Sequence, residues 1–254
     1  MLENTFIHVA GIGPRTERRL WQSGILTWEQ YLHSKRRPFS PTRDAFVRKS
    51  LTDSLINRDD ILFFRERLAS VDHWRLYDAF KDRAVYLDIE TSGGYEDPDD
   101  ITVIGLYDGE TVQTFVHGVN LHAFELAIVS YEVVITFNGT LFDLPIIRRH
   151  FPHVEVPPVH IDLRFLLKRL GYRGGLKAIE KMFAISRSPQ IEGLSGYDAV
   201  HLWEAYRSGD EGALECLIEY NTADIVNLKP LMEWGYREMK ERLLGQEVQK
   251  GFQK

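Results

Sequence analysis

The chain has 254 residues, of which 44% are hydrophobic and 12% aromatic. That composition suffices for a sizeable buried core, so a disordered chain is not expected. No apolar run reaches the length of a membrane span and the first residues show no secretory signal, so we expect no membrane association and a cytoplasmic location. The single cysteine, Cys216, excludes an internal disulfide and a multi-cysteine zinc site.

The net charge of −6 is unevenly distributed along the chain. Residues 1–80 contain 13 Lys or Arg and 10 Asp or Glu, whereas the remainder contains 18 and 27. This asymmetry predicts a basic front end attached to an acidic body. An acidic body can still bind a polyanion where metal ions cover some of its carboxylates.

Residues 1–80 are predicted to form a small all-α segment. In "GIGPRTERRLWQSGILTWEQYLHS", Pro14 suits a first helical turn, Gly24 breaks the pattern and Thr27 is a candidate N-cap, so we expect helix, tight turn, helix. Residues 35–49 hold six Lys or Arg and two prolines, which we interpret as an exposed connector. Apolar residues at helical spacing then predict a helical stretch over 58–80.

From residue 84 the hydrophobic period changes to that of strands. Runs rich in Val, Ile, Thr and Tyr predict five strands, at 84–91, 101–109, 110–118, 132–139 and 158–163. Helical patterns follow or separate them, at 121–130, 141–150, 163–170, 175–183, 199–207 and 211–228. This order predicts an α/β domain with a mixed sheet over 81–240, followed by a C-terminal tail, 241–254.

Two carboxylates lie together on the first predicted strand. Asp88 and Glu90 are two residues apart, so their side chains point to one face, while Leu87 and Ile89 point to the other. That spacing suits two carboxylates converging on one cation. The alternative is an incidental acid pair at the end of a strand.

A second candidate motif is "ITFNGTLFDLP", where Asn138-Gly139 turns the chain after a strand and Phe142-Asp143 starts a helix. In an open α/β sheet, ligands bind where strands end and helices begin. Asn138 can instead be a plain turn residue, and Asp143 a carboxylate that interacts with the helix dipole.

The third motif is "IEYNTADIVNL" on a strongly periodic helix. Tyr220 and Asp224 are four residues apart, so the phenol and the carboxylate are neighbours on one helix face. By itself this pair is also compatible with a simple surface hydrogen bond.

In this order, the three motifs resemble those of the DEDD superfamily of 3′–5′ exonucleases, which have a ribonuclease H-like fold. The tyrosine four residues before the last aspartate is typical of the DEDDy branch. The resemblance is closest to bacterial ribonuclease H-like predicted exonucleases and covers about residues 84–235, including "GGLKAIEKMFAI".

The resemblance implies a site made of four acids and a tyrosine. Asp88, Glu90, Asp143 and Asp224 would hold two Mg²⁺ or Mn²⁺ ions, which accept hard oxygen ligands. Tyr220 would orient the attacking water. Thr91, Asn138 and Phe142 are expected to contact the terminal nucleotide, and the product would be a nucleoside 5′-monophosphate.

Residues 8–32 separately resemble a helix–hairpin–helix DNA-binding element. Its Gly-rich helix start and nearby arginines predict an anion site made by Gly11, Gly13, Arg15 and Arg18. The alternative is a helical cap that only packs on the rest of the chain.

We therefore expect a nucleic-acid partner, namely single-stranded DNA or 3′ ends, with RNA as the other possibility. Two further functions compete with a 3′–5′ exonuclease. One is a nucleic-acid-binding module with an inactive nuclease domain, and the other is a ribonuclease H-type endonuclease. The sequence identifies no protein partner.

Overall fold

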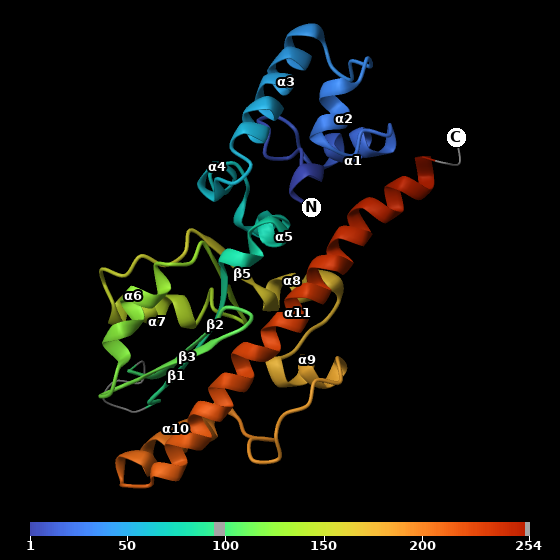
Figure 1. Cartoon of the computed structure of the whole chain (residues 1–254). Coiled ribbons are helices and arrows are strands. Elements are labelled where there is room, and N and C mark those ends of the chain that lie inside the picture. Colours follow the sequence, from blue (N-terminus) through green and yellow to red (C-terminus); the bar gives the residue numbers. More distant parts are fainter. Residues whose placement is uncertain (94–99, 252–254) are drawn as a thin grey trace. The chain divides into compact units, whose positions relative to one another are not determined.

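The computed structural model describes residues 1–93 and 100–251, with side chains up to residue 245. The chain divides into two compact units (Figure 1). Unit 1 comprises Met1–Lys81 and Tyr236–Lys254, and unit 2 comprises Asp82–Gly235. None of the helices in the described ranges combines the length and the apolar composition that a bilayer crossing requires.

Unit 1 is all-α in its described residues, as predicted. Its helices are α1 (Pro14–Gln22), α2 (Trp28–His33), α3 (Pro41–Ile56), α4 (Ile61–Arg65) and α5 (Tyr77–Phe80). The predicted helix–turn–helix is confirmed by α1 and α2: Pro14 opens α1, and Thr27 caps α2 by accepting a hydrogen bond from the Gln30 backbone N–H at 3.2 Å.

Two expectations for unit 1 need comment, of which the connector was wrong and the helical stretch is confirmed in separate pieces. Residues 35–49 are not simply a connector, because α3 begins at Pro41 and buries Asp44, Val47 and Leu51 along one face. Asp44 is stabilised there by the Tyr31 hydroxyl at 2.9 Å and by the Arg48 guanidinium at 2.7 Å. The predicted helical stretch over 58–80 is divided into α4, a 3₁₀ segment (Ser70–Leu76) and α5, with an extended residue, Ala69, between the first two.

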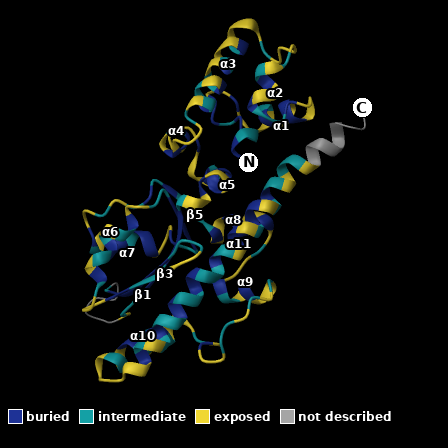
Figure 2. Ribbon diagram, viewed as in Figure 1, coloured by how far each residue is buried: buried dark blue, intermediate teal, exposed yellow. Residues whose placement is uncertain are grey.

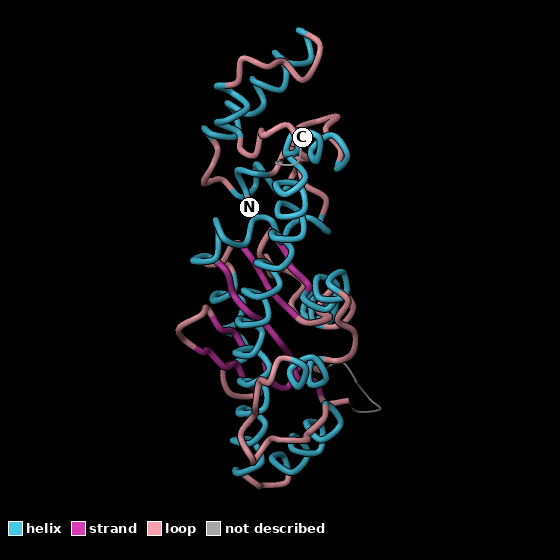
Figure 3. Tube along the Cα trace, turned by 90° about the vertical axis from the view of Figure 1, so that its right-hand side faces the viewer, coloured by secondary structure: helices cyan, strands magenta, loops and turns pink. Residues whose placement is uncertain are grey.

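Unit 2 is built on a five-stranded mixed sheet, and all five predicted strands are present. They are β1 (Ala84–Thr91), β2 (Ile101–Tyr107), β3 (Val112–Val116), β4 (Val133–Thr136) and β5 (Val159–Asp162). The order across the sheet is β3-β2-β1-β4-β5. Figure 3 shows the strands of unit 2 in magenta among its helices in cyan. The β1–β2 and β2–β3 pairs are antiparallel, whereas β1–β4 and β4–β5 are parallel. The predicted α/β fold with a mixed sheet is therefore confirmed.

Helices cover both faces of this sheet, so the strands are buried along most of their length (Figure 2). One core contains Leu87 and Ile89 of β1 together with residues of α6 (Phe124–Ile128) and α7 (Asp143–His150). The other contains residues of β2, β3, α10 (Gly196–Arg207) and α11 (Glu211–Gly251). Along the chain, helices α8 (Leu163–Leu170) and α9 (Leu176–Met182) come after α7 and before α10.

Helix α11 is much longer than the predicted 211–228, and it continues through residues 241–251 of the expected tail. The helix continues past Pro230, although a proline removes one backbone N–H donor. The next two residues, Leu231 and Met232, are fully buried, so packing holds this part of the helix in place. Further along, within unit 1, the Tyr236 ring lies 5.6 Å from that of Tyr77, and its hydroxyl accepts a hydrogen bond from the Met1 amino group at 2.6 Å.

Candidate active site

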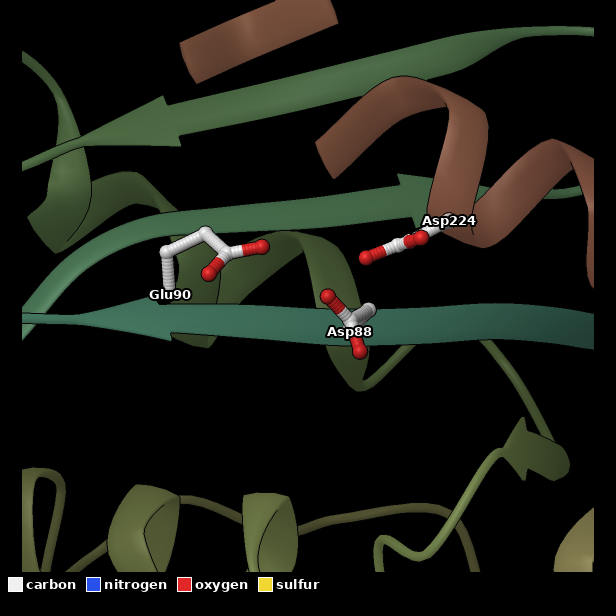
Figure 4. A group of neighbouring side chains, drawn as sticks. All are labelled: Asp88, Glu90 and Asp224. Atoms are coloured by element: carbon white, nitrogen blue, oxygen red, sulfur yellow. The ribbon is translucent and has the colours of Figure 1, made fainter. Parts of the chain in front are cut away.

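Strand β1 and helix α11 bring three carboxylates together in unit 2. Asp88, Glu90 and Asp224 each offer an oxygen, and these oxygens lie within 4.8 Å of one another. Figure 4 shows Asp88 and Glu90 projecting from one face of β1 and Asp224 reaching them from α11. The i, i+2 spacing on a strand accounts for the first pair, whereas only the packing of α11 on the sheet supplies the third carboxylate.

Asp143, the fourth predicted acid, is at the start of α7 and is 1% exposed. Its Oδ1 accepts a hydrogen bond from the Ile89 backbone N–H at 3.1 Å. Ile89 is the residue between Asp88 and Glu90, so Asp143 is held against the strand that carries this pair. It does not belong to the group of three converging carboxylates in the described residues. The structure therefore places Asp143 next to the three converging carboxylates, hydrogen-bonded to the strand β1 that carries two of them.

Burial and mutual repulsion make these acids hard to ionise without a cation. Burial raises the pKa of Asp88 well above its usual range, and the Asp143 and Asp224 carboxylates raise it further. Burial likewise raises the pKa of Glu90, with Asp224 adding to the shift. The pKa of Asp143 is raised by burial to about 7. Such a cluster favours a bound cation because a cation relieves both costs.

Two basic side chains that the sequence analysis did not select as site residues contact the cluster. The Lys177 ammonium, at the start of α9, donates to the Tyr220 hydroxyl at 2.5 Å and to Asp224 Oδ2 at 3.1 Å. The Arg187 guanidinium also hydrogen-bonds Asp224. A signal for Lys177 was present, because it lies in the "GGLKAIEKMFAI" segment on which the resemblance partly rests. No comparable signal marks Arg187.

Arg187 is held by a second buried carboxylate, that of Glu180 on α9. Its Nε and one Nη donate to the two Glu180 oxygens at 2.8 and 2.6 Å. Asn227 donates to the same carboxylate at 2.9 Å. Burial alone would lower the pKa of Arg187, but the Glu180 and Asp224 carboxylates raise it, so the guanidinium stays charged. Asp224 is thus oriented by a fixed ion-pair network rather than by packing alone.

Tyr220 is on the face of α11 that carries Asp224 and is 2% exposed. Its ring lies 4.1 Å from the Lys177 ammonium, in a cation–π arrangement. Burial raises the pKa of Tyr220 and the Asp224 carboxylate raises it further. The phenol therefore keeps its proton at neutral pH and can donate a hydrogen bond.

A glycine lets α11 approach the sheet closely at this point. Gly105 of β2 is paired with Asp88 in the β1–β2 register, and a Cβ there would lie 2.1 Å from Asn221 Oδ1. The Asn221 amide donates to Asp88 Oδ2 at 3.1 Å and to the Asp88 backbone carbonyl at 3.3 Å. Asn221, which the sequence analysis missed, links the helix that carries Asp224 to the strand that carries Asp88.

The Asn138-Gly139 turn follows β4 and borders the site, as its position after a strand suggests. Asn138 has a left-handed backbone, with φ of 72°. Asp162 holds the turn by accepting from the backbone N–H groups of Asn138 and Thr140 at 2.9 and 3.0 Å. The Asn138 side-chain oxygen accepts from the Arg164 guanidinium at 2.5 Å. Arg164 is a further site residue that the sequence analysis missed.

These side chains surround a cavity of about 390 Å³, which we call the carboxylate cavity. Asn138 and Phe142 line it, together with Lys177, Tyr220 and three of the acids, Asp88, Glu90 and Asp224. Phe142 is 41% exposed, so its ring is available to a ligand. Thr91, the last residue of β1, is half-buried and is not among the lining residues.

The predicted anion site of the N-terminal element lies in unit 1. Gly13 is the N-cap of α1, Gly11 has a left-handed backbone with φ of 75°, and Arg15 and Arg18 are exposed on the helix. The Arg43 guanidinium donates to the Ala10 carbonyl at 2.5 Å. This geometry leaves the two arginines accessible, and their binding of nucleic acid stays a prediction.

Comparison with known proteins gives a family match for unit 2. The family RNase_H_2, described as RNase_H superfamily, matches residues 85–236, more than half of the chain. No curated protein matches the chain significantly in sequence.

Two solved structures are similar in fold at low sequence identity. One is the family B DNA polymerase of the hyperthermophilic archaeon Pyrobaculum calidifontis, at 15% identity and a TM-score of 0.45, covering 63% of this chain and 24% of that one. The other is Escherichia coli RNase D, an exoribonuclease involved in structured RNA processing, at 19% identity and a TM-score of 0.46, covering 72% of this chain and 48% of that one. The chain therefore spans less than half the length of either protein.

Proposed function

The chain belongs to the RNase_H superfamily, and on that premise we propose that it is a metal-dependent 3′–5′ exonuclease that releases nucleoside 5′-monophosphates. The observation that carries the proposal is the convergence of Asp88, Glu90 and Asp224 within 4.8 Å, with Tyr220 one helical turn before Asp224. We further propose that the site is of the DEDDy type, with Asp143 as its fourth acid.

The donor set fits a hard divalent cation. The converging groups are carboxylate oxygens from three side chains, and oxygen ligands of this kind suit Mg²⁺ or Mn²⁺. Asp88, Glu90 and Asp224 would hold the metal, with Asp143 supporting a second ion through its remaining oxygen. Bound divalent ions supply an activated water and stabilise negative charge on the leaving oxygen.

The protein's own residues would position the water and the substrate. The Tyr220 hydroxyl, whose pKa burial raises in the metal-free protein, can donate to the attacking water and orient it. Lys177, which lies beside that hydroxyl, adds a positive charge where the substrate phosphate would sit. Phe142 and Asn138, on the cavity wall, would contact the terminal nucleotide.

The test is digestion of 5′-labelled single-stranded DNA and RNA of one sequence, with Mg²⁺, with Mn²⁺ and with EDTA. We expect a ladder that shortens from the 3′ end, nucleoside 5′-monophosphate as product, and no digestion in EDTA. A circular single strand should resist. Cleavage of the circle would identify a ribonuclease H-type endonuclease, and binding without any cleavage would identify an inactive nucleic-acid-binding module.

A tyrosine variant separates the proposed role of the hydroxyl from a structural one. Tyr220→Phe should slow hydrolysis by about 10²-fold through loss of water orientation while leaving metal affinity nearly unchanged. An equal fall in metal affinity, measured by titration calorimetry, would show that Tyr220 only supports the site.

We also propose that Gly11, Gly13, Arg15 and Arg18 form a helix–hairpin–helix-type phosphate contact, which supplies affinity with little sequence preference. Arg15→Gln/Arg18→Gln should lower the log–log salt dependence of duplex DNA binding by about 1.8, since each phosphate contact contributes about 0.9. An unchanged slope would mean that this element only packs within unit 1.

A further inference from the structure

A cationic face interrupts the otherwise acidic unit 2. Residues 82–235 contain 12 Lys or Arg and 24 Asp or Glu, but six of those twelve cations lie between residues 164 and 181, where Glu180 is the one acid. This segment runs from α8 through a short loop into α9. Half of the positive charge of the unit is therefore concentrated in 18 consecutive residues, next to the carboxylate cavity.

The surface of this segment is hollowed. A cavity of about 320 Å³ is lined by Arg164, Phe165, Lys168 and Arg173, together with apolar residues and Tyr172, and no acidic residue lines it. We call this cavity the α8 groove, and its charged and aromatic lining is formed by these first four residues. All four are exposed, and the Phe165 ring is 40% exposed.

Two cations of the α8 groove have no anion of their own. In the part of the chain that the structure describes, no carboxylate pairs with Lys168 or Arg173. Phe165 likewise has no aromatic neighbour among the described residues. Unpaired cations beside an exposed aromatic ring favour a ligand with phosphates and flat bases.

The α8 groove adjoins the carboxylate cavity. Phe137, Arg164 and Gly174 line both. A strand whose terminal nucleotide lies in the carboxylate cavity would therefore pass Arg164 and continue toward Lys168 and Arg173. At about 320 Å³, the groove is at the low end of the ~300–1,000 Å³ range of small-molecule pockets. It suits a single strand rather than a base-paired duplex.

We propose that the α8 groove binds the nucleotides preceding the 3′ end of a single nucleic-acid strand, with Lys168 and Arg173 contacting phosphates and Phe165 stacking on a base. The placement of the 3′ end rests on the proposed function, whereas the binding of a strand in the groove does not. The groove would make the enzyme prefer single-stranded ends over duplex ends.

The experiment compares Lys168→Gln/Arg173→Gln with Arg148→Gln/Arg207→Gln. The second double variant removes the same charge from exposed positions on α7 and α10, away from both cavities. Binding of labelled ten-nucleotide DNA and RNA strands is measured by fluorescence anisotropy in EDTA, over a series of salt concentrations. We expect the groove variant to lower the log–log salt dependence by about 1.4, since each single-strand phosphate contact contributes about 0.7. The control should change it much less.

Phe165→Ala tests the stacking role separately from charge. It should weaken binding of the ten-nucleotide strand at least about fivefold, because stacking on an aromatic ring contributes about 1 kcal/mol or more per base. The salt dependence should stay the same. Comparison of the DNA and RNA strands shows which sugar the groove accepts.

Cleavage provides the second readout. With Mg²⁺, the groove variant should raise KM for the ten-nucleotide strand and leave hydrolysis of a dinucleotide unchanged, since a dinucleotide fills only the carboxylate cavity. Equal effects of the two double variants on binding, or a preference of the wild-type protein for blunt duplex over single strands, would overturn the proposal. If the wild-type protein binds strands through the groove but cleaves none, the proposed function fails and the groove stands.

Discussion

Glu17 of unit 1 and the Asp88, Glu90 and Asp224 cluster of unit 2 are acids with opposite surroundings. In unit 1, Glu17 accepts hydrogen bonds from the backbone N–H groups of Phe6 and Ile7 at 2.7 and 3.2 Å and is paired with both Nη atoms of Arg75 at 3.0 and 3.1 Å. In unit 2, Asp88, Glu90 and Asp224 each direct a carboxylate oxygen toward the others, within 4.8 Å. Lys177 of α9 and Arg187 of the loop that follows it both donate hydrogen bonds to Asp224.

The difference distinguishes a structural acid from a site acid. Every oxygen of Glu17 has a donor from the same unit, so its charge is neutralised by the fold itself. Burial raises the pKa of Glu17 as well, but the Arg75 guanidinium opposes that rise. In the unit 2 cluster, burial raises the pKa values of Asp88 and Glu90, and the neighbouring carboxylates raise them further. A fold retains such an excess of charge where a ligand completes it.

The largest expected effect is on catalysis. Asp88→Asn should reduce the hydrolysis rate at least about 10³-fold, as with other essential catalytic groups, because it removes a carboxylate from the converging group. Stability of the metal-free protein should stay the same or rise, since one repelling charge is lost. The rate is measured on end-labelled strands and stability by urea denaturation. Full activity in this variant, purified free of contaminating nuclease, would contradict the catalytic assignment.

The matching change in unit 1 should act on stability alone. Glu17→Gln should cost about 3 kcal/mol of unfolding free energy, because it removes the bidentate charge partner of the buried Arg75 guanidinium and leaves only Asp72, at 3.3 Å. Activity per folded molecule should be preserved. Replacing both partners, with Glu17→Gln and Arg75→Met together, should recover part of the loss in a double-mutant cycle. Additive losses would show that the two side chains are not coupled.

Metal should stabilise the wild-type protein and not the site variant. At 100 times its dissociation constant, Mg²⁺ or Mn²⁺ should add about 2.7 kcal/mol to the unfolding free energy, which thermal melts detect as a raised midpoint. The gain should be absent in Asp88→Asn and intact in Glu17→Gln. A metal-induced shift of equal size in Asp88→Asn would place the metal elsewhere.

A smaller effect concerns pH in the metal-free protein. Because the pKa of Asp143 is raised from an ordinary 3.8 to about 7, the folded state holds a proton that the unfolded state has already released. Stability should therefore fall as pH rises from about 4 to about 7, and this loss should be weaker in Asp143→Asn. Urea midpoints measured in EDTA across this range provide the check. A rise in stability over the same interval would contradict the shift.

Hydrophobic period was a sound guide to the sheet and a weaker guide to the helices. The five strands follow from alternation and β-branched runs, which a buried sheet requires. The charges and prolines of residues 35–49 suggested an exposed connector, so the helix α3 was not predicted. Asp44 and Arg48 can pack in this helix because Tyr31 and the Leu32 carbonyl, which lie outside it in the sequence, hydrogen-bond to them. The full length of α11 was not predicted because proline strongly disfavours a helix interior by intrinsic propensity. In the folded protein, tertiary packing outweighs that cost at Pro230.

The sequence by itself determined the mixed α/β fold and the pairing of Asp88 with Glu90, because local spacing decides which face of a strand a side chain occupies. Only the tertiary structure decided that Asp224 meets that pair, that Gly105 admits Asn221 against the sheet, and that Arg187 joins Glu180 to Asp224. These contacts join segments far apart in the chain. They depend on how α9 and α11 pack on the sheet, which no local pattern specifies.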